Sequence, residues 1–236
     1  MVRAIRLLPA HPQRTAGLLA VCVSFAAVLA LSTVAAVGAA HEPRPMEIGA
    51  ARALPLGTVV TVEGSVTVPS GLLSSGGSLD QGFAIQDRTG GIYVSVATNL
   101  GVTLRQRVLV TGKLADSNGF LILVPASTGD VEVRGRGPGV RPLWLRTGSV
   151  GAANQGLLVR VVGVITLPVA PDPPFGNQVV VDDGSGPLRI FVNTSTGIDV
   201  SGLAPGQLLS VTGLSDEFDT PEIDPRFQSD LREPQD

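Results

Sequence analysis

Residues 83–94 read Phe-Ala-Ile-Gln-Asp-Arg-Thr-Gly-Gly-Ile-Tyr-Val, and this stretch decides the fold. Two short runs rich in apolar and aromatic residues flank a central Asp-Arg-Thr-Gly-Gly, which is typical of two β-strands joined by a tight turn. After the turn, Ile92 and Val94 share one face of the strand and Tyr93 lies on the other, because side chains alternate along a strand. We therefore predict a β-hairpin here.

The hairpin recurs in the second half of the chain. Residues 179–192 contain Val-Val-Val-Asp-Asp, a Gly-Ser-Gly turn and the run Leu-Arg-Ile-Phe-Val. The flanking segments recur in the same order, since residues 56–67 resemble 155–166, and 110–114 resemble 211–214. A repeat of this kind indicates two copies of one structural unit. We place these units at residues 47–140 and 141–236.

Each unit contains five predicted strands, separated by one long loop and several short turns. Only 4% of the residues are aromatic, so the core must consist mainly of Val, Leu, Ile and Ala. The many Val and Gly residues and the lack of long helix-forming runs favour an all-β fold. Because an isolated five-stranded sheet would leave its edges exposed, we predict that each unit closes into a small barrel.

The residues that carry a family resemblance are 57–64, 83–94 and 110–112, with looser copies in the second unit that end at residues 221–226 and 229–231. The sequence resembles the OB fold, and it is similar to OB domains attached to bacterial extracellular nucleases and to secreted nucleic-acid-binding proteins. The resemblance implies that an extended ligand binds across strands two and three of a barrel. No nuclease domain accompanies the two units, so it implies no catalytic activity.

The first forty residues differ in kind from the rest. A basic start is followed by an uncharged, mostly apolar run at residues 16–40 that ends in small residues; the basic residues are Arg3, Arg6 and Arg14. This order is typical of a secretory signal peptide, although the run is also long enough for an uncleaved membrane anchor. In both cases we expect the remainder to act outside the cytoplasm, with residues 41–46 as a lead-in linker and membrane contact only through residues 16–40.

Removal of residues 1–40 leaves no Cys and a single His, His41. Three of the 17 Lys and Arg residues lie in that segment and none of the 20 Asp and Glu, so the remainder carries a net charge of −6. This composition excludes disulfides and removes the usual ligands of zinc, haem and iron–sulfur sites. It also removes the base of Ser-His and Cys-His catalysis. We therefore predict a non-catalytic binding protein without a cofactor.

The candidate ligand-binding residues lie on the predicted face of strands two and three: Thr61, Gln86, Tyr93 and Ser95 in the first unit, and Arg160, Asp182, Arg189 and Phe191 in the second. Tyr93 and Phe191 occupy nearly matching places and are predicted to stack on bases, with cross-strand packing as the alternative. Arg160 and Arg189, expected on adjacent strands, are predicted to hold a phosphate or carboxylate, with pairing to Asp182 as the alternative.

Charge argues against generic nucleic-acid binding, because the first unit is neutral and the second has a net charge of −6. The acidity concentrates in residues 216–224, which contain Asp216, Glu217, Asp219, Glu222 and Asp224. Carboxylates of this kind suit Ca²⁺, but the run lacks the Asp-x-Asp-x-Asp-Gly register. We interpret it as a solvated acidic loop between strands four and five and predict no metal ligands.

Three functions follow from these observations. The leading hypothesis is a tandem OB-fold protein that binds an extended ligand, with single-stranded nucleic acid first. The alternative is a protein-interaction or assembly module at the cell envelope, which the acidic second unit favours. A metal-dependent hydrolase using residues 216–224 is disfavoured, because the mature chain would contain almost no His and no Cys.

Overall fold

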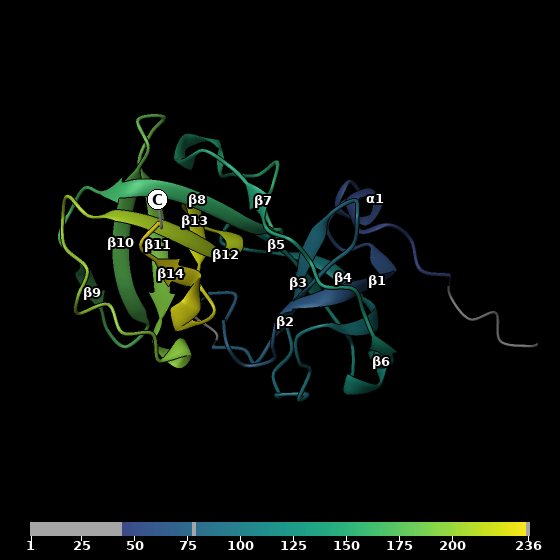
Figure 1. Ribbon diagram of the computed structural model, residues 1–236. Helices are drawn as coiled ribbons and strands as arrows, with labels where there is room; N and C mark the ends of the chain where they lie inside the picture. Colours follow the sequence, from purple (N-terminus) through teal and green to yellow (C-terminus); the bar gives the residue numbers. More distant parts are fainter. Residues whose placement is uncertain (1–43, 77–78, 235–236) are drawn as a thin grey trace, which may run out of the picture. The chain divides into compact units, whose positions relative to one another are not determined.

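A computed structural model describes residues 44–76 and 79–234 (Figure 1). The predicted signal segment lies outside the described residues. Within the described part of the chain, no helix is both long enough and apolar enough to cross a membrane. The structure is mostly β, and its strands form the two five-stranded OB-type barrels that the sequence predicts.

The first barrel comprises five strands in the spatial order β1-β2-β3-β5-β4, and pairing of β4 with β1 closes it. The bounds are β1 (Val59–Val68), β2 (Phe83–Gln86), β3 (Gly91–Val94), β4 (Gln106–Ser117) and β5 (Phe120–Val124). Neighbouring strands are antiparallel except β3 and β5, which are parallel. The short helix α1 (Ile48–Arg52) precedes the barrel, and η1 (Thr128–Asp130) and β6 (Val131–Arg136) follow it.

The second barrel repeats this topology with the order β8-β10-β11-β13-β12, closed by pairing of β12 with β8. The bounds are β8 (Leu158–Ile165), β10 (Gly176–Asp182), β11 (Leu188–Asn193), β12 (Leu208–Phe218) and β13 (Thr220–Asp224). Again the third and fifth strands, β11 and β13, are parallel. The added short elements are β7 (Leu143–Trp144), η2 (Thr147–Ser149), β9 (Ala170–Asp172), η3 (Thr194–Thr196), η4 (Gln228–Asp230) and β14 (Leu231–Arg232).

Alternation along the strands fills both barrel interiors. In β3, Ile92 and Val94 point into the first core, as predicted, and in β11 Ile190 and Val192 point into the second. These side chains are fully or almost fully buried. Burying each one stabilises the fold by about 1.5–3 kcal/mol relative to exposure. With Phe83 as the one aromatic side chain in these two clusters, β-branched residues and leucine supply nearly all of this stabilisation.

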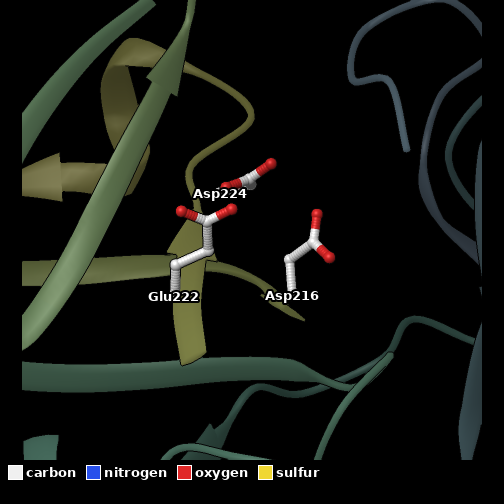
Figure 2. A group of neighbouring side chains, drawn as sticks. All are labelled: Asp216, Glu222 and Asp224. Carbon is white, nitrogen blue, oxygen red and sulfur yellow. The ribbon is translucent and has the colours of Figure 1, made fainter. Parts of the chain in front are cut away.

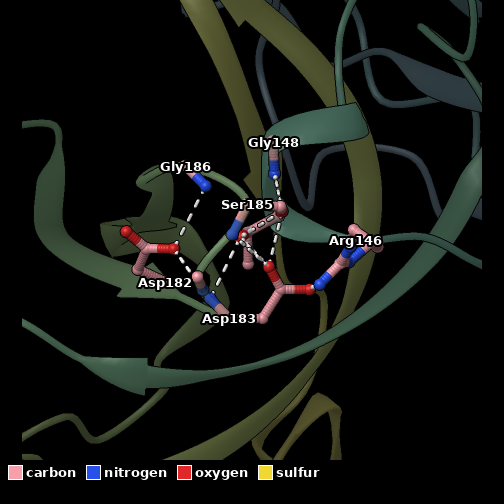
Figure 3. Close-up of polar contacts among 8 residues, drawn as sticks. Arg146, Gly148, Asp182, Asp183, Ser185 and Gly186 are labelled. Atoms are coloured by element: carbon pink, nitrogen blue, oxygen red, sulfur yellow. Dashed lines mark hydrogen bonds and ion pairs between the residues drawn. The ribbon is translucent and has the colours of Figure 1, made fainter.

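The predicted turn at residues 183–187 joins β10 to β11 and also holds the segment that enters the second barrel (Figure 3). Asp183 Oδ1 accepts hydrogen bonds from the Ser185 hydroxyl and from Thr147 Oγ1 (2.9 Å), and Arg146 lies 3.6 Å from its other oxygen. These hydrogen bonds, from Ser185 first, hold the pKa of Asp183 below its usual range. The turn therefore fixes the position of residues 146–148, next to β7.

The two barrels meet where the backbones of Gly91 and Gly156 approach each other. A Cβ atom on Gly91 would lie 2.0 Å from the carbonyl oxygen of Gly156, so a side chain there requires the backbones to move apart. Beside this approach, the Gln155 amide donates to Gly119 O (2.8 Å) and accepts from Leu121 N (3.0 Å). These contacts join the start of the second barrel to the β4–β5 end of the first.

A second contact between the barrels involves the buried guanidinium of Arg226. Its Nη1 donates to the carbonyl oxygen of Thr67 in β1 (2.7 Å), while its Nε and Nη2 pair with Asp230. Because Asp230 supplies the opposite charge and the carbonyl supplies a further acceptor, the guanidinium is buried with its charge balanced.

Substitution of Gly91 by Ala tests the junction. The added methyl group would overpack the contact with Gly156, so we expect the free energy of unfolding to fall by about 1–3 kcal/mol. Urea denaturation measures this change. Gly202→Ala is the matched control, because no atom lies within 4 Å of a Cβ at Gly202; we expect it to change stability by less than about 0.5 kcal/mol. Equal stability of the two variants would contradict the tight approach.

Candidate functional site

The predicted ligand face of the first barrel is closed. Tyr93 is on the outer side of β3, as predicted, but it is only 1% exposed. Leu73, from the long loop between β1 and β2, packs in the same cluster as Tyr93, and Leu72 packs against that cluster. The expectation of an exposed, stacking Tyr93 is therefore wrong, because the chain's own loop covers the ring.

A buried carboxylate anchors this covering loop. The Tyr93 hydroxyl lies 2.6 Å from Asp80 Oδ1 and 2.9 Å from Leu73 O. Ser75 Oγ (2.6 Å) and Ser95 Oγ also donate to Asp80. Ser95, a predicted ligand-binding residue, thus holds the loop in place. Burial, followed by the negative charge of Asp80, raises the pKa of Tyr93.

The other two candidates of the first barrel also make internal contacts. Thr61 is buried, and its hydroxyl lies 2.8 Å from that of Thr111 on the neighbouring strand β4. Gln86 Oε1 accepts a hydrogen bond from Leu158 N (2.9 Å) in the second barrel. The structure therefore does not bring Thr61, Gln86, Tyr93 and Ser95 together as an open surface.

The corresponding face of the second barrel lines a pocket of about 400 Å³. Strands β10, β11, β12 and β13 form its floor, and Phe175 and Phe218, the latter at the end of β12, are among its lining residues. Residues 74–76 and Leu79, from the long loop of the first barrel, also line it. Phe191, the predicted stacking residue of this barrel, lies in the pocket wall, as does Arg189.

Three buried carboxylates lie on the pocket floor (Figure 2). Asp216 on β12 is 6% exposed, and Glu222 and Asp224 on β13 are 3% and 2% exposed. Carboxylate oxygens from the three side chains all lie within 4.8 Å of one another. The interpretation of residues 216–224 as a solvated loop is therefore wrong for these three: they belong to paired strands, and the first barrel's loop and the pocket walls shield them from water.

Few donors compensate the three charges. Asp224 Oδ2 accepts from Asn193 Nδ2 (2.9 Å), and Asp216 Oδ1 accepts from Glu217 N (2.6 Å). Arg189 Nε lies 2.5 Å from Glu222 Oε2 in an ion pair. Asp224 Oδ1 is buried without a hydrogen-bond partner among the described residues. A buried carboxylate oxygen that lacks a partner costs about 1–3 kcal/mol or more.

Burial and mutual repulsion change the ionisation of the cluster. Burial, then the charge of Glu222, raises the pKa of Asp216 well above its ordinary value. Burial and the neighbouring Glu222 and Asp216 do the same for Asp224. Burial raises the pKa of Glu222 to about 7, against the opposing effect of Arg189. Because the unfolded chain ionises these groups at lower pH, their ionisation at neutral pH opposes folding.

Comparison of the two barrels shows that the fold does not require charges at these positions. Strand register places Asp216, Glu222 and Asp224 where the first barrel has Ala115, Ile122 and Val124. The parallel pairing matches Arg189 with Tyr93, since they lie opposite Glu222 and Ile122. Phe191, predicted to occupy a place that nearly matches that of Tyr93, lies two residues beyond Arg189 on β11. The positions that are apolar and covered by a loop in the first barrel therefore carry carboxyl groups that line a pocket in the second.

The predicted pairing of the two arginines is also wrong, because β10 lies between β8, which carries Arg160, and β11, which carries Arg189. The alternative, pairing of these arginines with Asp182, is not observed. Arg189 pairs with Glu222, and Asp182 accepts hydrogen bonds from the backbone amides of Gly184 and Gly186 in the turn. Arg160 belongs to a different surface.

That surface is an open groove of about 740 Å³ across β7, β8, β12 and β14. Trp144 is 62% exposed, and the Arg160 guanidinium stacks 5.3 Å from its ring centroid. Arg160 Nε donates to Thr212 Oγ1 (2.8 Å), which orients the guanidinium. Arg232 lies in the same groove, next to Ser210 in the strand register.

Sequence reasoning missed Trp144, the only Trp of the chain. A usable signal was present. Residues 133–171 contain no Asp or Glu but five arginines: Arg134, Arg136, Arg141, Arg146 and Arg160. In a chain of negative net charge, a basic stretch that encloses an aromatic residue is the composition expected of a nucleic-acid contact.

Comparison with known proteins finds similar chains among solved structures. No family model and no curated protein matches the sequence. Among solved structures, a murine DNA-binding protein bound to double-stranded DNA has a TM-score of 0.39 and 11% identity, with 70% of this chain and 90% of that chain covered. Fission yeast Pot1 with single-stranded DNA has a TM-score of 0.35 and 10% identity, covering 78% and 84%. A replication protein A heterotrimer bound to single-stranded DNA has a TM-score of 0.32 and 13% identity, covering 76% and 52%. Likeness at this level identifies no ligand.

The burial of Tyr93 predicts its titration. Tyr93 is the only Tyr, so phenolate absorbance reports this residue alone. In the folded protein we expect no phenolate signal near the ordinary pKa of about 10, whereas the chain in concentrated urea should titrate there. Because the unfolded chain releases the proton first, stability should fall as the pH rises above about 10. A simple titration near pH 10 in the folded state would contradict the closed face.

Proposed function

We propose that this protein is a non-catalytic OB-fold protein that binds single-stranded nucleic acid in the groove formed by Trp144, Arg160 and Arg232. The observation that carries the proposal is the exposed indole of Trp144 with the Arg160 guanidinium stacked on it. An exposed aromatic ring gives a base a surface to stack on, and this contact contributes about 1–3 kcal/mol per base.

The arrangement of the groove fits a strand that runs across the sheet. Trp144, Arg160 and Thr212 are register neighbours on β7, β8 and β12, so they form a row perpendicular to the strands. Arg232 stands beside this row on β14. A base stacked on Trp144 would place its phosphates near the two arginines, whose planar guanidinium groups match phosphate oxygens.

Charge supports this surface over the pocket of the same barrel. Polyanion binding depends on Lys and Arg contacts with phosphates. The pocket contains three buried carboxylates against one arginine and would repel a phosphate. The groove lies instead in the acid-free stretch of residues 133–171, together with β12 and β14. Its acidic members are Asp230, which Arg226 neutralises, and the exposed Glu233 at the rim.

We further propose that the protein acts outside the cytoplasm. The order of a basic start, an apolar run and small residues in positions 1–40 supports export. The chemistry described supports a binding role without catalysis, because a stacked arginine on an indole supplies neither a general base nor a nucleophile.

Intrinsic fluorescence tests the groove directly, since Trp144 is the only Trp. Titration with a short oligothymidylate at low salt should quench the emission as a base stacks on the indole. We expect Trp144→Ala to weaken binding about 5- to 100-fold, which corresponds to the loss of one stacking contact. Arg160→Gln should reduce the slope of log K against log salt by about one. Fluorescence anisotropy of a labelled oligonucleotide measures both variants.

Phe218→Ala is the matched control, because Phe218 is an exposed aromatic residue at the pocket of the same barrel. We expect it to bind the oligonucleotide like the wild type. The proposal fails if the wild type shows no binding at low salt, or if Trp144→Ala and Phe218→Ala bind equally. If the protein binds no oligonucleotide but still binds a protein partner, the alternative of a protein-interaction module would be favoured.

A further inference from the structure

We propose that Asp216, Glu222 and Asp224 bind a divalent metal cation, with Ca²⁺ as the preferred ion. The site lies in the pocket of the second barrel, apart from the groove proposed for nucleic acid, and does not depend on that proposal. One oxygen from each of the three carboxylates lies within 4.8 Å of the other two, and the residues come from the paired strands β12 and β13 (Figure 2). Carboxylate oxygen is the donor that hard cations prefer in proteins.

A buried carboxylate with a structural role in this same chain provides an internal standard. Asp80 is buried to a similar degree as the cluster, and protein donors surround it. It accepts from Ser75 N and Oγ, Gly82 N, the Tyr93 hydroxyl and Ser95 Oγ. Such saturation is the normal condition of a buried acid. Asp80 therefore shows how many hydrogen-bond donors surround a buried carboxylate with a purely structural role in this protein.

The cluster differs from Asp80 in this respect. Asp224 is 2% exposed, and its Oδ1 is buried without a hydrogen-bond partner among the described residues. Asp216 and Asp224 each accept one described hydrogen bond, from Glu217 N and Asn193 Nδ2. A cation at the centre would supply a positive partner for Asp216 and Asp224, and a second one, besides Arg189, for Glu222.

The local charge fits a divalent ion. Metal binding requires the three carboxyl groups to be ionised; together with the Arg189 guanidinium they would then carry a charge of −2, which one divalent cation neutralises. The first barrel supplies the comparison, because the matching positions there are Ala115, Ile122 and Val124 and the fold closes without charges. The three carboxylates therefore occur in the second barrel and not in the first, and the barrel topology does not require them.

Size and surroundings favour Ca²⁺ over Mg²⁺. With bonds of about 2.3–2.6 Å, Ca²⁺ spans oxygens that are up to 4.8 Å apart. With bonds of about 2.0–2.1 Å, Mg²⁺ reaches across only about 4.2 Å and demands a regular octahedron. Ca²⁺ takes six to eight ligands, and the pocket of about 400 Å³ leaves room for water to complete the set.

Calorimetric titration of the chelator-treated protein tests the site, with CaCl₂, MgCl₂ and MnCl₂ as separate titrants. We expect Ca²⁺ to bind with a stoichiometry of one and to raise the melting temperature by about 5 °C or more at saturation. Asp224→Asn and Asp216→Asn should each weaken Ca²⁺ binding at least tenfold. In chelator they should melt no lower than the wild type, because ionisation of the buried carboxyl groups opposes folding and an amide does not ionise. Loss of binding is therefore separable from loss of folding.

Asp172→Asn is the matched control. Asp172 lines the same pocket but lies outside the cluster, where its Oδ2 accepts from Gln178 Nε2 (3.2 Å). This variant should retain the Ca²⁺ response. Trp144→Ala should retain it too, so a failure of the proposed nucleic-acid binding can be distinguished from a failure of the proposed Ca²⁺ binding. Absence of binding with all three ions overturns the proposal, and so does equal binding by Asp224→Asn and the wild type. Tighter binding of Mg²⁺ than of Ca²⁺ overturns the choice of ion.

Discussion

The close backbone approach of Gly91 and Gly156 is the constraint on which the rest of the structure depends. Each glycine belongs to a different barrel, and no side chain fits between them. Because the backbones meet, Gln155 reaches the β4–β5 end of the first barrel, where it both donates and accepts. The same docking brings residues 74–76 and Leu79 of the first barrel over strands β11 to β13 of the second. The pocket, its buried carboxylates and their perturbed ionisation all follow from that placement.

The two barrels show how one topology gives two surfaces of opposite character. In the first barrel, the long loop folds back over its own strands and buries Tyr93 beside Asp80. In the second, the equivalent loop is rich in proline and leaves the floor open to a pocket. The buried carboxylates of the two barrels differ in their hydrogen bonds. Asp80 accepts from many nearby donors, whereas the cluster of Asp216, Glu222 and Asp224 accepts from few. The difference therefore lies in the loops and in outward-facing residues, while the inward-facing residues keep the same barrel.

The sequence predicted what is local and could not predict what depends on a distant loop. Strand alternation and the Asp- and Gly-containing turns act within a few residues, so the hairpin at residues 83–94, its repeat and the five-stranded barrels were predicted correctly. The outward direction of Tyr93 also followed from alternation. Its burial did not, because the covering residues Leu72 and Leu73 come from a loop without periodicity. Glu222 and Asp224, two residues apart, could be placed on one face, but their shielding comes partly from the other barrel.

The position of β12 explains how one small barrel accommodates both a basic groove and an acidic pocket. Thr212, which orients Arg160, and Asp216, of the carboxylate cluster, lie on the same outward side of this strand. Four residues of strand separate them by about 13 Å. This separation is greater than the Debye length of about 8 Å at physiological ionic strength, although buried charges are screened less than exposed ones. β12 thus carries a residue of the arginine groove at one end and a buried carboxylate at the other. On the proposed function, an acidic net charge is compatible with nucleic-acid binding, because the contact with phosphates depends on the arginines of the groove and not on the charge of the whole chain.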